Sequence, residues 1–351
     1  MTASLILNRS ATPVLLREHP WEQGSLMVQV GVVPDPDGER LRLYYVVCFR
    51  EDPGKNVLCL AYSKDGYEWE KPDLGDGTNI VMRATGNETE WGVFLPKTIL
   101  FDPAEENPDW RWKLLYWERP EMTMQAGLCW AVSPDGIRWA PLLGRPVIDN
   151  ANDAGSACLV NPKAEKGPRE TDLHVYQQTW IYNPALPTDR DNLKMMHRVI
   201  SIWQCDPFPD KWIGPTQILT PDAEDPPDLQ FYWLSVFHTP TGYGGLLNCH
   251  HTGDQTMDLH LVSSRDGWTW KRELNRRPLI PLGPKGSFDC GMTMAMSRPV
   301  EWKGKVFLFY NGRATLHDRQ FRYPEEPGPD PSNGIGRAEL DPRILTIGEP
   351  E

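Results

Sequence analysis

The chain has 351 residues, 40% of them hydrophobic, which is enough apolar material for a folded core and excludes a disordered chain. Its net charge is −12, and Lys and Arg do not cluster as they do in proteins that follow a phosphate backbone, so nucleic acid is not expected as a partner. The unusual feature is the aromatic content, with 15 Trp and 11 Tyr. Such rings either pack between sheets, the more common role, or lie against the apolar face of a sugar.

The first twenty residues lack a basic segment followed by a continuous apolar one, so no signal peptide is predicted. No apolar run is long enough to span a bilayer, and no membrane partner is expected. The seven cysteines are scattered, odd in number and without CxxC spacing. They are interpreted as free thiols in a reducing compartment, and a cytoplasmic location is predicted.

Three segments share one template along the chain. They are LCLAYSKDGYEWEKP from Leu58, LCWAVSPDGIRWAPL from Leu128 and LHLVSSRDGWTWKRE from Leu259. Each predicts a strand, a tight Ser-x-Asp-Gly turn and a second short strand that carries a tryptophan. The tryptophans, Trp69, Trp139 and Trp270, are predicted to pack one sheet on the next. A degenerate copy without Asp-Gly, RVISIWQCDPFPDKW, fills the longer interval and ends at Trp212.

An apolar strand precedes each of these four copies, and a fifth such strand follows the last copy. These strands are RLRLYYVVC, RWKLLYWER, DLHVYQQTW, GYGGLLNCH and KVFLFYNGR, and they recur at intervals of roughly 60 to 70 residues. Helical periodicity is hard to find, and 34 Pro with 29 Gly fit many tight loops. The pattern predicts an all-β, five-bladed β-propeller forming a single domain over residues 1–351. The expected blades cover roughly 21–75, 88–142, 153–218, 228–275 and 286–350, with an N-terminal strand within 4–16 closing the ring.

The segments AYSKDGYEWEKPDLG, SPDGIRW, DLQFYWLSVF, SSRDGWTWKR, GSFDCG and FLFYNGR together resemble five-bladed β-propeller glycoside hydrolases, the relatives of families 32, 43, 117 and 130. The resemblance covers nearly the whole chain and is specific for the fold, not for the substrate. The Asn-Asp-Pro-Asn-Gly motif of a fructosidase is missing, and the turn is one residue shorter than the sialidase Asp-box. The resemblance implies a central funnel in which acids at the start of each innermost strand perform catalysis.

Glycoside hydrolysis canonically needs two carboxyl groups, which a propeller would take from different blades. One acid precedes the apolar strand in each unit, at Glu22, Glu90, Asp153, Asp228 and Asp289. Glu22, Asp153 and Asp289 are the predicted catalytic residues, because small neighbours leave room for a substrate. The competing interpretation is that these acids occupy ordinary polar loops.

Other residues of these segments are predicted to bind the substrate: Trp21, Glu90, Trp91, Asp228, Tyr232, His250 and Arg313. The adjacent His250 and His251 should point to opposite faces of a strand, so at most one faces the channel. No metal ligands and no cofactor are predicted, although a divalent cation such as calcium in the channel is left open.

The predicted function is a glycoside hydrolase, exo-acting on a small glycoside or oligosaccharide, so the expected partner is a small carbohydrate. The alternatives are a glycoside phosphorylase, in which arginine would bind phosphate, and a non-catalytic propeller that binds a glycan or a protein.

Overall fold

Alternating apolar residues and tight turns fold this chain almost entirely into antiparallel sheets. The computed structural model describes residues 4–49, 52–87, 93–121, 123–149, 152–161, 173–183, 191, 193–205, 208–317 and 333–348. Within these ranges the helical elements are short 3₁₀ turns, such as η1 (Pro20–Glu22). The described part of the chain contains no helix with the length and hydropathy required to cross a bilayer.

Among the described residues, three sheets have four strands each, in sequence order. The first sheet contains β2 (Leu26–Pro34), β3 (Leu41–Cys48), β4 (Val57–Ser63) and β5 (Ile80–Arg83). The second contains β6 (Leu95–Phe101), β7 (Trp112–Glu118), β8 (Gly127–Ser133) and β9 (Ala140–Pro141). The third contains β10 (Gly155–Leu159), β11 (Leu173–Tyr182), β12 (Met196–Cys205) and β13 (Trp212–Leu219).

A fourth, nine-stranded sheet completes the molecule. One part contains β14 (Leu229–Thr239), β15 (Gly242–His251), β16 (Thr256–Ser264) and β17 (Lys271–Arg272). The other contains β18 (Met292–Met294), β19 (Val300–Trp302), β20 (Lys305–Arg313), β21 (Asn333–Leu340) and β1 (Ile6–Arg9). The two antiparallel parts are joined by one parallel pair, Met257 with Met292.

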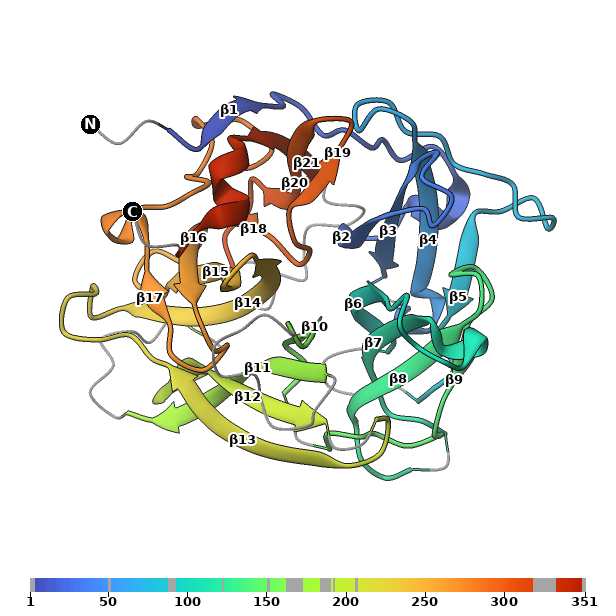
Figure 1. Ribbon diagram of the computed structural model, residues 1–351, viewed down its shortest axis with the longest axis horizontal. Helices are drawn as coiled ribbons and strands as arrows, with labels where there is room; N and C mark the ends of the chain where they lie inside the picture. The colour runs from blue at the N-terminus through green and yellow to red at the C-terminus, as the bar shows by residue number, and fades with distance from the viewer. Residues whose placement is uncertain are drawn as a thin grey trace.

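The sheets follow one another around a common centre (Figure 1). The first strands of successive sheets touch, since β2 contacts β6, β6 contacts β10 and β10 contacts β14. The ring returns to its start because β20 and β21 contact β2. The N-terminal strand β1 pairs with the outer side of β21, so the first and last strands of the described chain belong to one sheet. The five apolar strands expected from sequence are confirmed as β3, β7, β11, β15 and β20.

The Ser-x-Asp-Gly turns are built as predicted. In the second sheet, Ser133 Oγ accepts the N–H of Gly136, and Asp135 Oδ1 accepts two further backbone N–H groups. Gly136 has φ +72°, a conformation that L-residues rarely adopt. The same bonds recur around Asp65 and Asp266, so side chains of the turn itself satisfy its backbone.

The repeat tryptophans join neighbouring sheets, which confirms their predicted role. Each tryptophan ring packs against an aromatic ring of the adjacent sheet. The pairs are Trp139 with Tyr44, Trp212 with Trp130, Trp270 with Tyr176 and Trp69 with Phe309, at centroid distances of 6.3, 6.1, 5.9 and 5.3 Å. All seven cysteines are free, and five of them are buried.

Candidate functional site

A pocket of about 440 Å³ opens where the sheets meet, and it is lined by residues from all of them. We call it the central pocket. Its polar lining residues are Ser25, Asn56, Lys97, Asn152, Asp153, Gln178, Arg198, Tyr232, Asn311, Arg313, His317 and Asn333. Its volume is in the range typical of small-molecule sites.

Asp153 is the acidic residue among the described lining residues. It precedes β10, and its side chain is 32% exposed. Its Oδ2 accepts a hydrogen bond of 2.9 Å from Lys97 Nζ on β6, and the buried Lys97 also lies 5.9 Å from the Trp233 ring. One carboxylate oxygen is therefore fixed by a buried ammonium group, in a side chain that remains open to the pocket.

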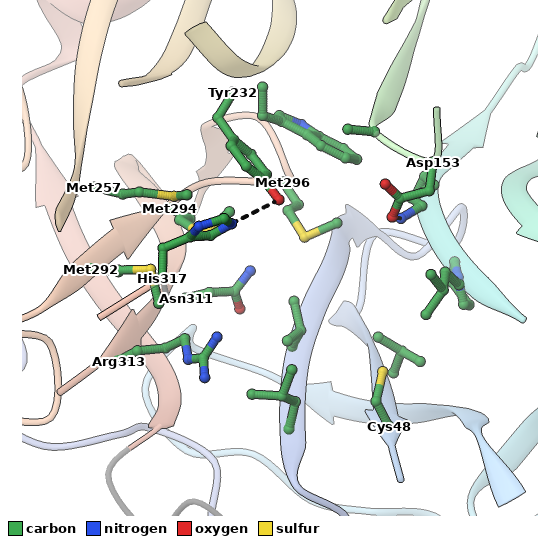
Figure 2. A pocket seen from close by; sticks show the side chains of 18 of the residues that line it. Cys48, Asp153, Tyr232, Met257, Met292, Met294, Met296, Asn311, Arg313 and His317 are labelled. Carbon is green, nitrogen blue, oxygen red and sulfur yellow. Dashed lines mark hydrogen bonds and ion pairs between the residues drawn. The ribbon is translucent and has the colours of Figure 1, made fainter. Parts of the chain in front are cut away.

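The opposite wall carries basic groups. Arg198 on β12, Arg313 on β20 and His317 beyond it all line the pocket, and Arg198 lies 5.4 Å from the Tyr232 ring. Figure 2 shows Tyr232 joined to His317, with the Tyr232 Oη to His317 Nε2 distance being 3.3 Å. Burial holds the pKa of His317 well below 6.5, and Arg198 and Arg313 lower it further, so the ring is neutral.

Five methionines form much of the remaining wall, a large share of the 11 in the chain. Met257, Met292 and Met294 lie on the side of His317, across the pocket from Asp153 (Figure 2). Met27 and Met296 complete the set, and the rings of Trp180 and Trp233 add aromatic faces. Thioethers are polarizable and adapt to irregular shapes, and indole faces suit the C–H face of a sugar.

Of the residues predicted from sequence, the structure brings Asp153, Tyr232 and Arg313 together in the central pocket. Burial raises the pKa of Tyr232, so its hydroxyl stays protonated and can donate a hydrogen bond. Glu90 and Trp91 lie outside the described residues.

Glu22 lies in η1, in the segment that leads into β2. It is fully buried and does not line the central pocket. Its carboxylate accepts hydrogen bonds from Lys71 Nζ at 2.8 Å, Tyr45 Oη at 2.5 Å and the backbone N–H groups of Glu18 and His19. Burial by itself would raise the pKa of Glu22, but these donors leave it below 4.5. Glu22 is thus an enclosed ion in this structure.

Asp289 is likewise enclosed, at 3% exposure, and does not line the pocket. Its Oδ2 accepts from Arg9 Nη2 at 2.5 Å and from Tyr310 Oη at 2.8 Å, and Oδ1 accepts from Ser287. By accepting from both Arg9 on β1 and Tyr310 on β20, this carboxylate links β1 to the rest of its sheet.

Trp21, Asp228 and His250 also lie outside the lining. Trp21 stacks on His19 and donates to Asn79, and Asp228 accepts from the N–H of Gly253. His250 is fully buried behind the pocket wall, with its ring 4.5 Å from that of His317.

His250 and His251 occupy opposite faces, as expected for neighbours on a strand. Whereas His250 contacts His317, His251 Nε2 lies 3.3 Å from Asp258 on the other side of β15. The strand prediction is confirmed here, and the histidine that faces the centre is His250.

Sequence reasoning missed Lys97, Arg198 and His317. Lys97 lies inside an apolar run, LPKTILF, and a lysine within a buried strand is a signal for a partnered charge. Arg198 opens the degenerate copy, and His317 follows Arg313 in YNGRATLHD, but nothing local distinguishes either residue from an ordinary loop or strand position.

Comparisons with known proteins agree with the fold. No known protein-family profile and no curated protein matches the sequence. Among solved structures, a complex of BT0996 with RGII superposes with a TM-score of 0.63 at 10% identity, covering 97% of this protein and 93% of that one.

Two further structures belong to numbered glycoside hydrolase families. One comes from work on the GH130 family of mannoside phosphorylases, described as containing glycoside hydrolases that target β-1,2 mannosidic linkages in Candida mannan. It has a TM-score of 0.61, 14% identity and coverage of 99% of this protein and 97% of that one. The other is a thermostable family-43 glycoside hydrolase, with a TM-score of 0.56, 12% identity and coverage of 93% and 95%. The protein shares their fold.

Proposed function

We propose that this protein is a glycosidase-type enzyme that cleaves a glycosidic bond in the central pocket, with Asp153 as the group that exchanges a proton with the substrate. The observation that carries the proposal is the position of Asp153. It is the acidic residue among the described lining residues, it is one-third exposed, and Lys97 fixes one of its oxygens. Proton transfer needs a carboxyl group within reach of the leaving oxygen. The fold shared with glycoside hydrolases supports the proposal.

The pocket suits a small glycoside or the end of an oligosaccharide. A volume of about 440 Å³ is at the low end of small-molecule sites. Trp180 and Trp233 offer ring faces for stacking, while Tyr232, Asn152 and Gln178 line the pocket with groups that can bind sugar hydroxyls. Cleavage would then occur at the end of a sugar chain.

Phosphorolysis is a second candidate, favoured by the charges of the wall. The described lining residues include Lys97, Arg198 and Arg313 against Asp153 alone, so their formal charge is positive. An inverting hydrolase needs a second carboxylate to activate water. Hydrogen phosphate is itself a nucleophile: its oxygen attacks the anomeric carbon while the carboxyl group protonates the leaving oxygen. The proton lost by phosphate then restores that carboxyl group, so one carboxyl group suffices.

We further propose that the chain forms a single ring of five blades. Three blades are the four-stranded sheets, and we count the nine-stranded sheet as two blades joined by the parallel Met257–Met292 pair. The first strand of each blade, or the residues just before it, would then border the central pocket. Lining residues that are distant in sequence, such as Asp153 and Arg313, would meet there through this radial arrangement.

The test is a screen of aryl glycosides and oligosaccharides, with and without inorganic phosphate, on the wild type and on Asp153→Asn and Glu22→Gln variants. We expect Asp153→Asn to lower kcat at least about 100-fold, a usual contribution of general acid–base catalysis. Glu22→Gln should retain kcat at temperatures where it is folded. Turnover that requires phosphate assigns a phosphorylase.

Unchanged activity in Asp153→Asn would refute the assignment of Asp153. Binding of an oligosaccharide without any turnover, unaffected by Asp153→Asn, would instead favour the non-catalytic propeller.

A further inference from the structure

A cluster of buried ligand-type side chains lies on the Tyr232 side of the central pocket, and one of its members, His317, also lines the pocket. Its members are Asp191, His250 on β15 and His317, whose ligand atoms lie within 4.8 Å of one another. All three residues are at most 2% exposed. The residues come from three places far apart in the sequence, so the fold, not a local motif, assembles them.

His250 is the member that ordinary hydrogen bonding does not explain. It is 0% exposed, and neither Nδ1 nor Nε2 makes a hydrogen bond of regular geometry among the described residues. The Gln255 side chain interacts favourably with the ring, without forming a hydrogen bond of regular geometry. Buried imidazoles normally satisfy at least one ring nitrogen, because an orphaned polar atom costs about 1–3 kcal/mol. The ring is directed into the cluster, 4.5 Å from the ring of His317.

Gln255 adds a fourth polar group in a strained position. It is fully buried with φ +65°, which is uncommon for a residue with a side chain. Its Nε2 donates to the carbonyl of Thr252, so Oε1 is the atom turned toward His317 Nδ1, at 3.3 Å. Its backbone carbonyl also accepts the N–H of His317 at 2.9 Å. Two bonds thus hold the Gln255 amide oxygen against the cluster.

Asp191 is oriented by Arg198. Arg198 Nη1 lies 2.5 Å from Oδ2, while its Nη2 lies 3.2 Å from Oδ1. Oδ1, the more weakly held oxygen, is 3.8 Å from His317 Nδ1. Carboxylates that bind metals are commonly held by such an outer partner on the second oxygen.

We propose that Asp191, His250 and His317, with Gln255 as a further oxygen donor, bind one divalent transition-metal ion of the zinc class. For zinc bonds of about 2.0 Å, tetrahedral ligand atoms lie about 3.3 Å apart, which is close to the 3.3 and 3.8 Å separations from His317 Nδ1. Two imidazoles exclude a calcium-type site, because calcium takes oxygen ligands. With the metal on Nδ1, Nε2 of His317 carries the proton and donates to Tyr232 Oη, 3.3 Å away.

A second cluster on the other face of β15 is a poorer ligand set. It consists of Cys249, Asp258 and His260. Arg272 Nη2 lies 3.0 Å from His260 Nδ1, and guanidinium only donates, so Nδ1 accepts and the proton of the neutral ring is on Nε2. Nε2 lies 3.0 Å from Asp258 Oδ1, although the two atoms do not have the geometry of a hydrogen bond. Because Arg272 occupies Nδ1, the proton of the neutral His260 ring cannot move there to free Nε2 for a metal, and His260 serves as a control.

A metal bound to His317 would hold Tyr232 in place through the hydrogen bond between the two side chains. Metal binding can be measured without any assay of glycosidase activity. The experiment uses the full chain, stripped with a chelator and titrated with Co²⁺, whose visible d–d absorption reports tetrahedral coordination. Zn²⁺ and Ca²⁺ compete in separate titrations. The variants are His250→Ala and His317→Ala, with His260→Ala and His174→Ala, another fully buried histidine, as matched controls.

We expect one equivalent of Co²⁺, displaced by Zn²⁺ and not by Ca²⁺, and binding at least about 100-fold weaker in the two cluster variants but unchanged in the controls. Circular dichroism checks folding. If a cluster variant fails to fold, anomalous diffraction at the zinc edge from wild-type crystals locates the ion.

Absence of stoichiometric binding would overturn the proposal, as would wild-type affinity in folded His250→Ala. Loss of binding in His260→Ala alone, or an anomalous peak away from His250, would also overturn it.

Discussion

Buried carboxylates in this protein are stabilised by donors from distant segments, and Glu22 is the clearest case. Its acceptor oxygens are occupied by Lys71, Tyr45 and two backbone N–H groups. Lys71 is itself only 4% exposed and is also paired with the exposed Glu18. Because the two charges are buried together, removal of Glu22 leaves the buried Lys71 ammonium paired with the exposed Glu18 in place of a buried carboxylate.

We predict that Glu22→Gln lowers the free energy of unfolding by about 3 kcal/mol at pH 7. The pKa of Glu22 is lower in the folded than in the unfolded state, so the wild type gains stability from it above about pH 4.5 and loses that stability as the pH falls further. Urea denaturation from pH 7 to pH 3 should show a shallower pH dependence in the variant.

Two results would contradict this prediction. One is a Glu22→Gln variant as stable as the wild type at pH 7. The other is a variant that keeps its stability but loses turnover, which would return Glu22 to a catalytic role.

The unit of this fold is the hairpin that ends in a Ser-x-Asp-Gly turn. The turn satisfies its own backbone, and its glycine comes close to the neighbouring sheet. At Gly136, a Cβ would lie 2.6 Å from Tyr44 Oη and 2.7 Å from Arg42 Nη1. Tyr44 Oη also donates to the Gly136 carbonyl at 3.0 Å. One turn therefore contributes to hairpin formation and to the contact between two sheets.

We predict that Gly136→Ala destabilises the protein by about 3 kcal/mol or more, because backbone strain and a steric clash act together. Gly38→Ala is the matched control. Gly38 has the same φ of +72° but nothing within 4 Å of an added Cβ, so strain alone should cost about 1–2 kcal/mol. Chemical denaturation measures both, and equal losses would show that the approach of Tyr44 is unimportant.

Across the ring as a whole, the N-terminal strand joins segments that are almost the full length of the chain apart. Arg9 on β1 donates to Asp289, to Tyr310 and to the carbonyl of Pro281. Asp289 is 3% exposed and would retain Tyr310 and Ser287 as partners without Arg9. The charge on this carboxylate is therefore balanced from the other end of the chain.

We predict that Arg9→Ala lowers the free energy of unfolding by about 3 kcal/mol, since it strands a buried carboxylate. Arg343→Ala, which breaks the exposed Arg343–Asp341 pair, is the control and should cost less than about 1 kcal/mol. Thermal and urea unfolding compare the two variants, and similar small losses would mean that Arg9 does not hold the ring.

The local structure of this protein could be predicted from its residues alone. Alternation in RLRLYYVVC and its counterparts specified the strands, and Ser-x-Asp-Gly specified the turns, because both depend on neighbouring residues and on backbone conformation. The tryptophans that join the sheets could also be identified, since a ring repeated at one place in each hairpin has one packing role.

Which acids face the central pocket depends on contacts that form only when the chain is folded. Glu22, Asp153 and Asp289 look alike in sequence, each at the entry to an apolar segment. They differ in the basic partner that folding brings close to each of them. In the same order, these partners are Lys71, Lys97 and Arg9, which lie 49, 56 and 280 residues away in the sequence. An ion pair depends on distance in space and on burial, and neither is encoded in the residues next to the acid.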